Sequence, residues 1–234
     1  MKNPEVKKAF ILAAGLGTRL KPLTEKLPKA LVPFKGKPMI ENVISKLNRA
    51  GIYNILINTH HHADKMEEYF ANRSGNENIT LIHEAQILGT GGAIKNAEKH
   101  LSDTEAFLVY NTDVDCEVDI GDFFDFHSCN NAIASLCVKK RKSSRYKINK
   151  EKGALIGRTE NGENAIYGIK SDTISKKAFC GIHIINTKIF KYLNKNENFD
   201  IIPEYMSILQ KNEEIMTYDI SGIYWKDLGK LQNL

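Results

Sequence analysis

The 234-residue chain is predicted to fold as an α/β protein, with three layers around a mostly parallel central sheet and an antiparallel addition. Short apolar runs alternate with helix-like patterns over the first half, which is the rhythm of parallel strands joined by crossover helices. The second half loses that rhythm, which predicts the antiparallel addition. With 42% apolar and 26% charged residues, the chain can form one sizeable core but is short for two, so a single domain over 1–234 is expected.

The first half supplies the expected parallel strands and their crossover helices. Strands are predicted at 7–13, 52–59, 79–84 and 106–113, and helices at 38–50, 63–72 and 91–101. Pro38 suits the first turn of the first helix, and Gly51 can close that helix in a left-handed conformation. Apolar residues recur between them at helical spacing, namely Ile40, Val43, Ile44 and Leu47.

The second half supplies the antiparallel part. Strands are predicted at 131–140, 178–186, 214–221 and 224–229, with a helix over 201–210. The polar stretch 139–164 contains three glycines that interrupt only short apolar runs, so it is expected to form a mobile hairpin or arm.

A glycine-bearing loop, LAAGLGTRLKPLTEKLPK, occupies residues 12–29 directly after the first apolar strand. Gly15 and Gly17 allow positive φ and close approach of a ligand, while successive N–H groups without ladder partners can bind phosphate oxygens. Arg19 and Lys29 add permanent positive charge. This combination is typical of a site for the phosphates of a nucleoside triphosphate.

Two common phosphate loops do not fit residues 12–29. A dinucleotide-binding turn needs a third glycine and an uninterrupted helix, but Leu20 and Pro22 stand there, and no Gly-Lys-Ser/Thr of a Walker loop occurs. The stretch instead closely resembles the signature LAAGxGTRLxPLTxxxPK of the sugar-1-phosphate nucleotidylyltransferases, also called NDP-sugar pyrophosphorylases. Among the family, the chain resembles short, single-domain members such as the mannose-1-phosphate guanylyltransferases and N-acetylmuramate-1-phosphate uridylyltransferases.

That resemblance implies a Rossmann-like nucleotidyltransferase domain that converts NTP and sugar 1-phosphate to NDP-sugar and pyrophosphate, for cell-envelope or glycan precursors. Residues 1–115 would bind the nucleotide and residues 116–234 the sugar phosphate. Arg19 would stabilise the pyrophosphate, and Lys29 would lie near the α-phosphate. The main chain of the loop would hold the nucleotide, through Leu12, Ala13, Ala14, Gly15, Gly17 and Thr18.

Two acids are candidates for a magnesium site. Asp113 lies where a parallel strand ends, the usual place for a ligand in an open α/β sheet, and Mg²⁺ prefers one or two carboxylates completed by phosphate oxygens and water. Asp227 is the candidate second acid, and the resemblance supports both. Members of the family usually have a glycine directly before the acid at this strand end, and Thr112 stands at that position before Asp113. Asp115 is an alternative ligand or a turn residue.

A second glycine-rich turn, LGTGGA at residues 88–93, opens a helix whose unpaired N–H groups could serve a base or a ribose. It is either an ordinary strand-to-helix turn or, as the resemblance implies, the place where Gly89 lines the base pocket. Glu84 or Gln86 could read the base. A carboxylate accepts hydrogen bonds well from guanine N1–H and N2–H₂ or from the cytosine amine, and it poorly satisfies uracil or thymine, which have a single N–H donor. An acidic residue here therefore favours guanine.

The acceptor sugar phosphate is assigned to two segments by the resemblance. Gly181, in FCGIHIIN, matches a glycine that lets the sugar approach the backbone, although it could equally mark a strand bulge. The arm KKRKSSRYKINKEKG contains Arg145 and Lys147, either of which could grip the acceptor phosphate. A solvated run of charge is the alternative reading of the arm.

Two other functions fit the same fold. A cytidylyltransferase acting on phosphocholine would need an aromatic cage for the quaternary ammonium, whereas Phe123, Phe124 and Phe126 have the spacing of helix packing. A non-catalytic sensor of nucleotide sugars is the other option, but the presence of both acids and both cations argues against it.

Composition bounds the partners and the compartment. A net charge of +5 and a single aromatic in the basic arm, Tyr146, do not indicate nucleic-acid binding. Four cysteines without a C-x-x-C pair, a start without an export signal and no long apolar run predict a cytoplasmic protein off the membrane. His60, His61 and His62 are expected to form a polar loop rather than a metal site. The sequence carries no signal for oligomeric state.

Overall fold

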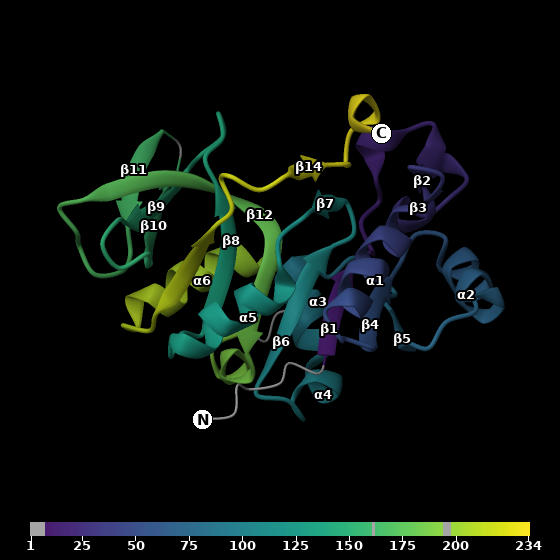
Figure 1. Cartoon of the computed structure of the whole chain (residues 1–234), viewed down its shortest axis with the longest axis horizontal. Helices are drawn as coiled ribbons and strands as arrows, with labels where there is room; N and C mark the ends of the chain where they lie inside the picture. The colour runs from purple at the N-terminus through teal and green to yellow at the C-terminus, as the bar shows by residue number, and fades with distance from the viewer. Residues whose placement is uncertain (1–7, 161, 194–197) are drawn as a thin grey trace.

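The computed structural model describes residues 8–160, 162–193 and 198–234 and has one twisted sheet between two layers of helices (Figure 1). The parallel strands of the first half lie in the order β6-β1-β4-β5. They span Lys8–Leu12 (β1), Asn54–Thr59 (β4), Asn78–His83 (β5) and Ala106–Asn111 (β6). The carboxyl ends of these four strands therefore meet at one edge of the sheet, as predicted.

Apolar residues on both faces of the strands explain the three layers. In β1, Ala9 and Ile11 belong to one buried cluster and Phe10 to the other, because successive side chains of a strand point to opposite faces. On the first face lie α1 (Met39–Arg49), α2 (Ala63–Asn72) and α5 (Ile120–Cys129). On the second lie α3 (Gly89–Asn96), α4 (Glu98–Leu101) and α6 (Ile201–Gln210).

Most predicted elements are confirmed within one to three residues. The predicted helix over 91–101 is divided into α3 and α4, and Gly51 closes the turn after α1 with φ +76°. The part of the first predicted strand at residue 7, and the start of the chain in which no export signal was found, lie outside the described residues.

The second half is antiparallel only in part. Strand β12 (Ile174–Asn186) runs antiparallel to β6, but β8 (Ala134–Lys139) is antiparallel to β12 and so runs parallel to β6 and to the other strands of the first half. Strand β13 (Ile215–Asp219) pairs in parallel with β8. The expectation of antiparallel strands therefore holds for the pairing of β8 with β12 and is wrong for the pairing of β13 with β8. The chain returns to β8 through the crossover helix α5, which is how parallel strands are joined.

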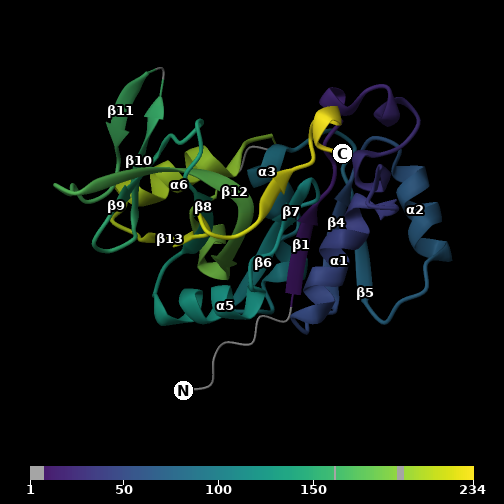
Figure 2. The ribbon, with the colours of Figure 1, turned by 45° about the horizontal axis from the view of Figure 1, so that its top comes forward.

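The predicted arm is a three-stranded antiparallel extension. Its strands, β9 (Tyr146–Asn149), β10 (Leu155–Glu160) and β11 (Glu163–Ile166), continue from the first half of β12. Figure 2 shows this extension at the opposite end of the molecule from α2. The long β12 thus joins the central sheet to the arm.

A short ribbon brings the C-terminal segment back over the sheet. Strand β14 (Trp225–Asp227) pairs antiparallel with β7 (Val114–Cys116), which follows β6 directly. The C-terminus consequently lies beside the first loop, where β2 (Pro33–Phe34) and β3 (Lys37–Pro38) form a small hairpin (Figures 1 and 2).

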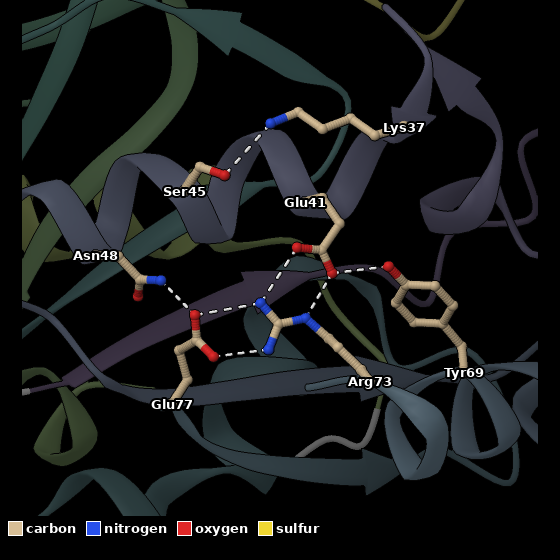
Figure 3. Close-up of polar contacts among 7 residues, drawn as sticks. All are labelled: Lys37, Glu41, Ser45, Asn48, Tyr69, Arg73 and Glu77. Carbon is tan, nitrogen blue, oxygen red and sulfur yellow. Dashed lines mark hydrogen bonds and ion pairs between the residues drawn. The ribbon is translucent and has the colours of Figure 1, made fainter. Parts of the chain in front are cut away.

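A cluster of buried charges ties α1 to α2 and to the start of β5 (Figure 3). Arg73 donates to Glu41 through Nε (2.6 Å) and to Glu77 through Nη1 (2.6 Å), while Tyr69 donates to Glu41 (2.8 Å) and Asn48 donates to Glu77. The hydrogen bond from Arg73 lowers the pKa of Glu77 to about 2. Burial, assisted by Glu41, raises the pKa of Tyr69 to about 12.

Among the described residues, no helix has both the length and the apolar character that a membrane span requires.

Candidate active site

Polar groups from four parallel strands meet at the carboxyl edge of the sheet. The loop after β1, Asn58 at the end of β4, Glu84 after β5 and Asp113 after β6 line one cavity of about 230 Å³. Its lining comprises Leu12, Ala14, Gly15, Lys29, Asn58, Glu84, Ile87, Gly89, Thr90, Asn111, Thr112, Asp113 and Asp200. This nucleotide-side cavity contains most of the residues predicted to hold the nucleotide.

The loop after β1 presents consecutive amides to solvent. Gly17 has φ +61°, and a Cβ there would lie 2.7 Å from the Thr24 side chain, so only glycine fits. The hydroxyl of Thr24 donates to the Gly17 carbonyl (2.9 Å) and pins the loop. Across the described residues, the amides of 15–18 have no protein acceptor. These amides are available to an anion, as the sequence predicted.

The expectation for Gly15 was wrong in its conformation. Gly15 does not adopt a positive φ, and a Cβ on it would meet nothing within 4 Å. The positive φ of the loop lies at Gly17 instead.

Asn58, which sequence reasoning missed, organises the start of the loop. Its Oδ1 accepts from the amides of Ala13 (2.6 Å) and Ala14 (3.3 Å), and its Nδ2 donates to Glu84 Oε1 (2.7 Å). The amides of Ala13 and Ala14 are therefore committed to the protein and are not free for phosphate. The other oxygen of Glu84 accepts from the Leu88 amide (3.2 Å), so this buried carboxylate is held in one orientation within the cavity.

The two predicted acids lie together, with both predicted cations beside them. A Cβ built on Gly229 would lie 2.7 Å from Arg19 Nη2, 2.8 Å from Asp113 Oδ2 and 2.9 Å from Asp227 Oδ1. Lys29 forms a half-buried ion pair with Asp113, with Nζ 2.5 Å from Oδ2. Four charged side chains from distant parts of the sequence thus converge at one point.

Main-chain pairing explains how Asp227 reaches Asp113. In the β7–β14 ribbon Asp227 is paired with Val114, and the Leu228 amide donates to the Asp113 carbonyl (2.7 Å). The Gly229 amide then donates to Asp227 Oδ1 (2.8 Å), which orients this carboxylate. The proximity rests on backbone hydrogen bonds rather than on side chains alone.

The donor set at this point fits a magnesium ion. Two carboxylates supply hard oxygen ligands, and Mg²⁺ usually takes one or two of them together with substrate phosphates and water. No group of three or more His, Cys, Asp or Glu side chains within the described ranges could hold a metal alone. The remaining ligands would therefore have to come from substrate and solvent.

Asp115 serves as a buried ion-pair partner. Its oxygens accept from Lys35 (2.9 Å) and Lys46 (3.1 Å). Burial would raise the pKa of Asp115, but the bonds from the two lysines outweigh burial and lower it. The structure thus favours ion pairing over metal ligation for this acid.

The second glycine-rich turn packs against the segment before α6. Gly89 has φ +70°, and a Cβ on it would lie 2.6 Å from the Phe199 carbonyl. That carbonyl accepts from the amides of Gly91 (2.9 Å) and Gly92 (3.1 Å). The expectation of unpaired amides at the start of this helix was therefore wrong for these two residues, although Gly89 itself lines the nucleotide-side cavity.

A larger cavity of about 510 Å³, the acceptor-side cavity, adjoins the first. The two share Leu12, Thr90, Asn111 and Asp200 in their walls. The rest of the larger wall comes from the arm and α6, namely Arg141, Ser143, Arg145, Tyr146, Arg158, Ala178, Phe179, His183, Ile201, Ile202 and Pro203.

Of the two predicted cations of the arm, only Arg145 lines this cavity. Lys147 is buried outside the lining and is paired across the sheet with Lys176. Burial, assisted by the charge of Lys176, lowers the pKa of Lys147. Gly181 lies behind the wall at a strand irregularity with φ +78°, where a Cβ would be 2.9 Å from Asn111 Nδ2.

The three consecutive histidines each bond to a main-chain carbonyl. His60 Nδ1 lies 2.8 Å from the Glu84 carbonyl, and the rings of His61 and His62 lie 3.3 and 3.2 Å from the carbonyls of Thr24 and Glu25. His61 and His62 thus contact the loop at residues 12–29, and His60 contacts the segment after β5.

The aromatic cluster of α5 is part of the core rather than a cage. Phe123 is buried, and the rings of Phe123 and Phe126 each lie 5.2 Å from that of Tyr218. These contacts are the helix packing that the spacing indicated.

A family model described as nucleotidyl transferase matches residues 8–234. The chain belongs to the nucleotidyl transferase family. The mannose-1-phosphate guanyltransferase of Yarrowia lipolytica is 31% identical over 229 residues, covering 95% of this chain and 61% of that protein. The enzyme of the same name from Schizosaccharomyces pombe is 31% identical over 230 residues, with the same coverage. The chain thus spans 61% of the length of these curated relatives.

Solved structures of this nucleotidyl transferase fold superpose along nearly the whole chain. HddC from Yersinia pseudotuberculosis has a TM-score of 0.77 at 24% identity, covering 97% of this chain and 96% of its own. A UDP-glucose pyrophosphorylase in complex with UDP-glucose has a TM-score of 0.76 at 21% identity, covering 97% and 95%. These likenesses establish the predicted three-layer, Rossmann-like fold.

Proposed function

We propose that the chain transfers a nucleotidyl group from an NTP to a sugar 1-phosphate, giving an NDP-sugar and pyrophosphate. The convergence of Arg19, Asp113 and Asp227 around Gly229, beside a loop with free amides, carries this proposal. Family membership and the names of the relatives support it. The division into a nucleotide-binding half, 1–115, and a sugar-phosphate-binding half, 116–234, follows from the same assignment.

The residues act mainly by positioning and by neutralising charge, as is usual for transfer at phosphorus. The free amides of 15–18 bind the β- and γ-phosphates, and Arg19 stabilises the departing pyrophosphate. Lys29 moves from Asp113 to the α-phosphate oxygens, where negative charge develops. The acceptor phosphate oxygen attacks the α-phosphorus in line, opposite the leaving group.

Asp113 and Asp227 would hold a magnesium ion. When bound, this ion would neutralise the phosphates and fix the triphosphate relative to the acceptor. Lys29 is already paired with Asp113 at this point, so it lies beside the proposed ion site.

We assign guanine as the base. Glu84 faces the nucleotide-side cavity with its orientation set by Asn58 and Leu88, and a carboxylate can accept from both N1–H and N2–H₂ of guanine. The relatives named mannose-1-phosphate guanyltransferase and an HddC structure complexed with GMP-PN agree with this choice. Gly89 lines the same cavity, and Arg145 and Gly181 belong to the acceptor side. The cytoplasm is the proposed compartment.

Release of pyrophosphate tests the proposal directly. The chain is incubated with each of four NTPs and a panel of sugar 1-phosphates, with and without Mg²⁺, and with CTP and phosphocholine as a separate reaction. We expect Mg²⁺-dependent release with GTP and a hexose 1-phosphate. Release with CTP and phosphocholine alone would favour the cytidylyltransferase, and nucleotide-sugar binding without any release would favour a sensor.

A further inference from the structure

Three arginines line the acceptor-side cavity. Arg141 and Arg145 lie before β9, and Arg158 lies on β10. Burial raises the pKa of the Tyr146 phenol, whereas the positive charge of each of the three guanidiniums favours the phenolate and so partly offsets that rise. The three arginines and Tyr146 thus belong to the wall of the same cavity.

Two of these arginines are held in place by the protein. Arg141 stacks on Trp225, with Cζ 4.2 Å from the ring centroid, and donates to the Phe179 carbonyl (2.7 Å). Its buried Nε has no protein partner. Arg158 pairs with Glu160, with Nε 2.5 Å from Oε1. Preorganised guanidiniums of this kind suit recognition of carboxylate or phosphate.

Arg145 has no ion-pair partner among the described residues. Its backbone is nevertheless fixed, because its carbonyl accepts from the Thr159 amide (2.7 Å) across the arm. The side chain is exposed and lines the cavity, so it can reach a ligand there.

The acceptor-side cavity is cationic overall. Asp200 is the one acid among its described lining residues, and Asp200 accepts from the Thr90 hydroxyl at 3.3 Å. His183 is neutral because complete burial lowers its pKa to about 3. The lining thus carries three guanidiniums and one carboxylate, and Arg158 is also paired with Glu160 outside the lining.

The arginines are separated from the residues assigned to transfer. Lys29 and Asp113 line only the nucleotide-side cavity, whereas the three arginines line only the acceptor-side cavity. The reacting phosphate of the acceptor must lie at the first group, near the α-phosphorus. The arginines are then left to a different part of the same molecule.

Resting on the function proposed above, we propose that the preferred acceptor is a sugar 1-phosphate carrying a second anionic group, a carboxylate or a further phosphate, which Arg141, Arg145 and Arg158 bind. The acceptor spans both cavities, with its 1-phosphate toward Lys29 and its second anion toward the arm. A neutral hexose 1-phosphate would leave the arginine cluster without a ligand.

Matched acceptor pairs test this inference. The pairs are mannose 1-phosphate with mannose 1,6-bisphosphate, glucose 1-phosphate with glucuronic acid 1-phosphate, and N-acetylglucosamine 1-phosphate with N-acetylmuramate 1-phosphate. Dissociation constants are measured by calorimetry without NTP, and kcat/KM by pyrophosphate release with GTP. The variants are Arg145→Gln and, as a matched loss of charge on the arm outside the cavity lining, Lys150→Gln.

We expect at least one doubly anionic acceptor to bind about 10- to 100-fold more tightly than its neutral partner, the range for a hydrogen bond to a charged group. Arg145→Gln should weaken binding of the doubly anionic acceptor much more than binding of its neutral partner, and so remove most of that preference, whereas Lys150→Gln should keep it. The bisphosphate and the carboxylated sugars show which anion is preferred.

Equal binding within all three pairs would overturn the inference. An equal loss for neutral and doubly anionic acceptors in Arg145→Gln would also overturn it, because the arginine would then hold the reacting phosphate. Preferential binding that depends on Arg145 but yields no pyrophosphate with any NTP would contradict the proposed function and leave the inference standing.

Discussion

Replacing Gly229 by alanine adds one methyl group at the point where the candidate catalytic groups meet. Its Cβ would lie within 2.7–2.9 Å of Arg19 Nη2, Asp113 Oδ2 and Asp227 Oδ1, all closer than carbon atoms of real side chains approach such groups. Each contact is the end of a side chain, so the side chains rather than the backbone must move. The fold should therefore survive while the site opens.

The magnitude follows from these distances. Restoring ordinary contact requires displacements of several tenths of an ångström at all three groups, and a misplacement of about 1 Å can cost roughly 10²-fold in rate. We expect kcat to fall by about 10²-fold. Moving Asp227 also weakens its hydrogen bond from the Gly229 amide, worth about 1 kcal/mol. In a chain of this size that corresponds to a Tm lower by about 2–4 °C.

Gly222→Ala is the matched control. Gly222 has no positive φ, and a Cβ there would meet nothing within 4 Å, so the two variants share the same change in backbone entropy. Turnover is measured by pyrophosphate release and stability by thermal unfolding. If Gly229→Ala and Gly222→Ala had equal turnover, the three charged side chains around Gly229 would not be the reacting centre.

Three further outcomes are expected. Lys29→Ala should reduce turnover by roughly a hundredfold or more without unfolding the protein, since Lys29 is assigned to the developing charge, and an unchanged rate would remove that role. Asn58→Ala should lower the free energy of unfolding by about 1–3 kcal/mol, because the amides of Ala13 and Ala14 and the Glu84 carboxylate lose their partner, and it should raise the KM for GTP. Denaturant titrations and kinetics that give wild-type values for the variant would contradict this. The pKa of Glu77 is lowered from 4.5 in the unfolded chain to about 2 in the folded protein. The ionised carboxylate therefore stabilises the folded state by on the order of 2 kcal/mol above pH 4.5, and this contribution is lost as the pH falls toward 2. Unfolding of Glu77→Gln should lack that part of the pH dependence, and identical pH profiles would refute the role of the Arg73 pair.

Local sequence signals predicted the strands and the phosphate loop, because alternation, glycine placement and strand ends act over a few residues. The place of Asp113 at the end of β6 follows from the same logic. Its proximity to Asp227 was implied only by the family resemblance, since it depends on the β7–β14 pairing between distant segments.

What the sequence could not supply depends on tertiary contacts. In the sequence Asn58 looks like an ordinary strand residue. Its hydrogen bond to the Ala13 amide forms only because β4 lies beside β1 in the folded sheet. The Phe199 carbonyl accepts hydrogen bonds from the Gly91 and Gly92 amides of α3, because the segment before α6 lies beside that helix. The sequence likewise could not show which of the two loop glycines takes a positive φ, which in the fold is Gly17.

Binding of Mn²⁺, a spectroscopic substitute for Mg²⁺, tests the central claim most directly. Electron paramagnetic resonance titration in the presence of a non-hydrolysable GTP analogue counts the ions bound to the wild-type chain and to Asp113→Asn and Asp227→Asn. We predict one tightly bound ion in the wild type and a loss of at least about tenfold in affinity in each variant. Wild-type affinity in Asp227→Asn would show that the two carboxylates do not share an ion, and would contradict the account.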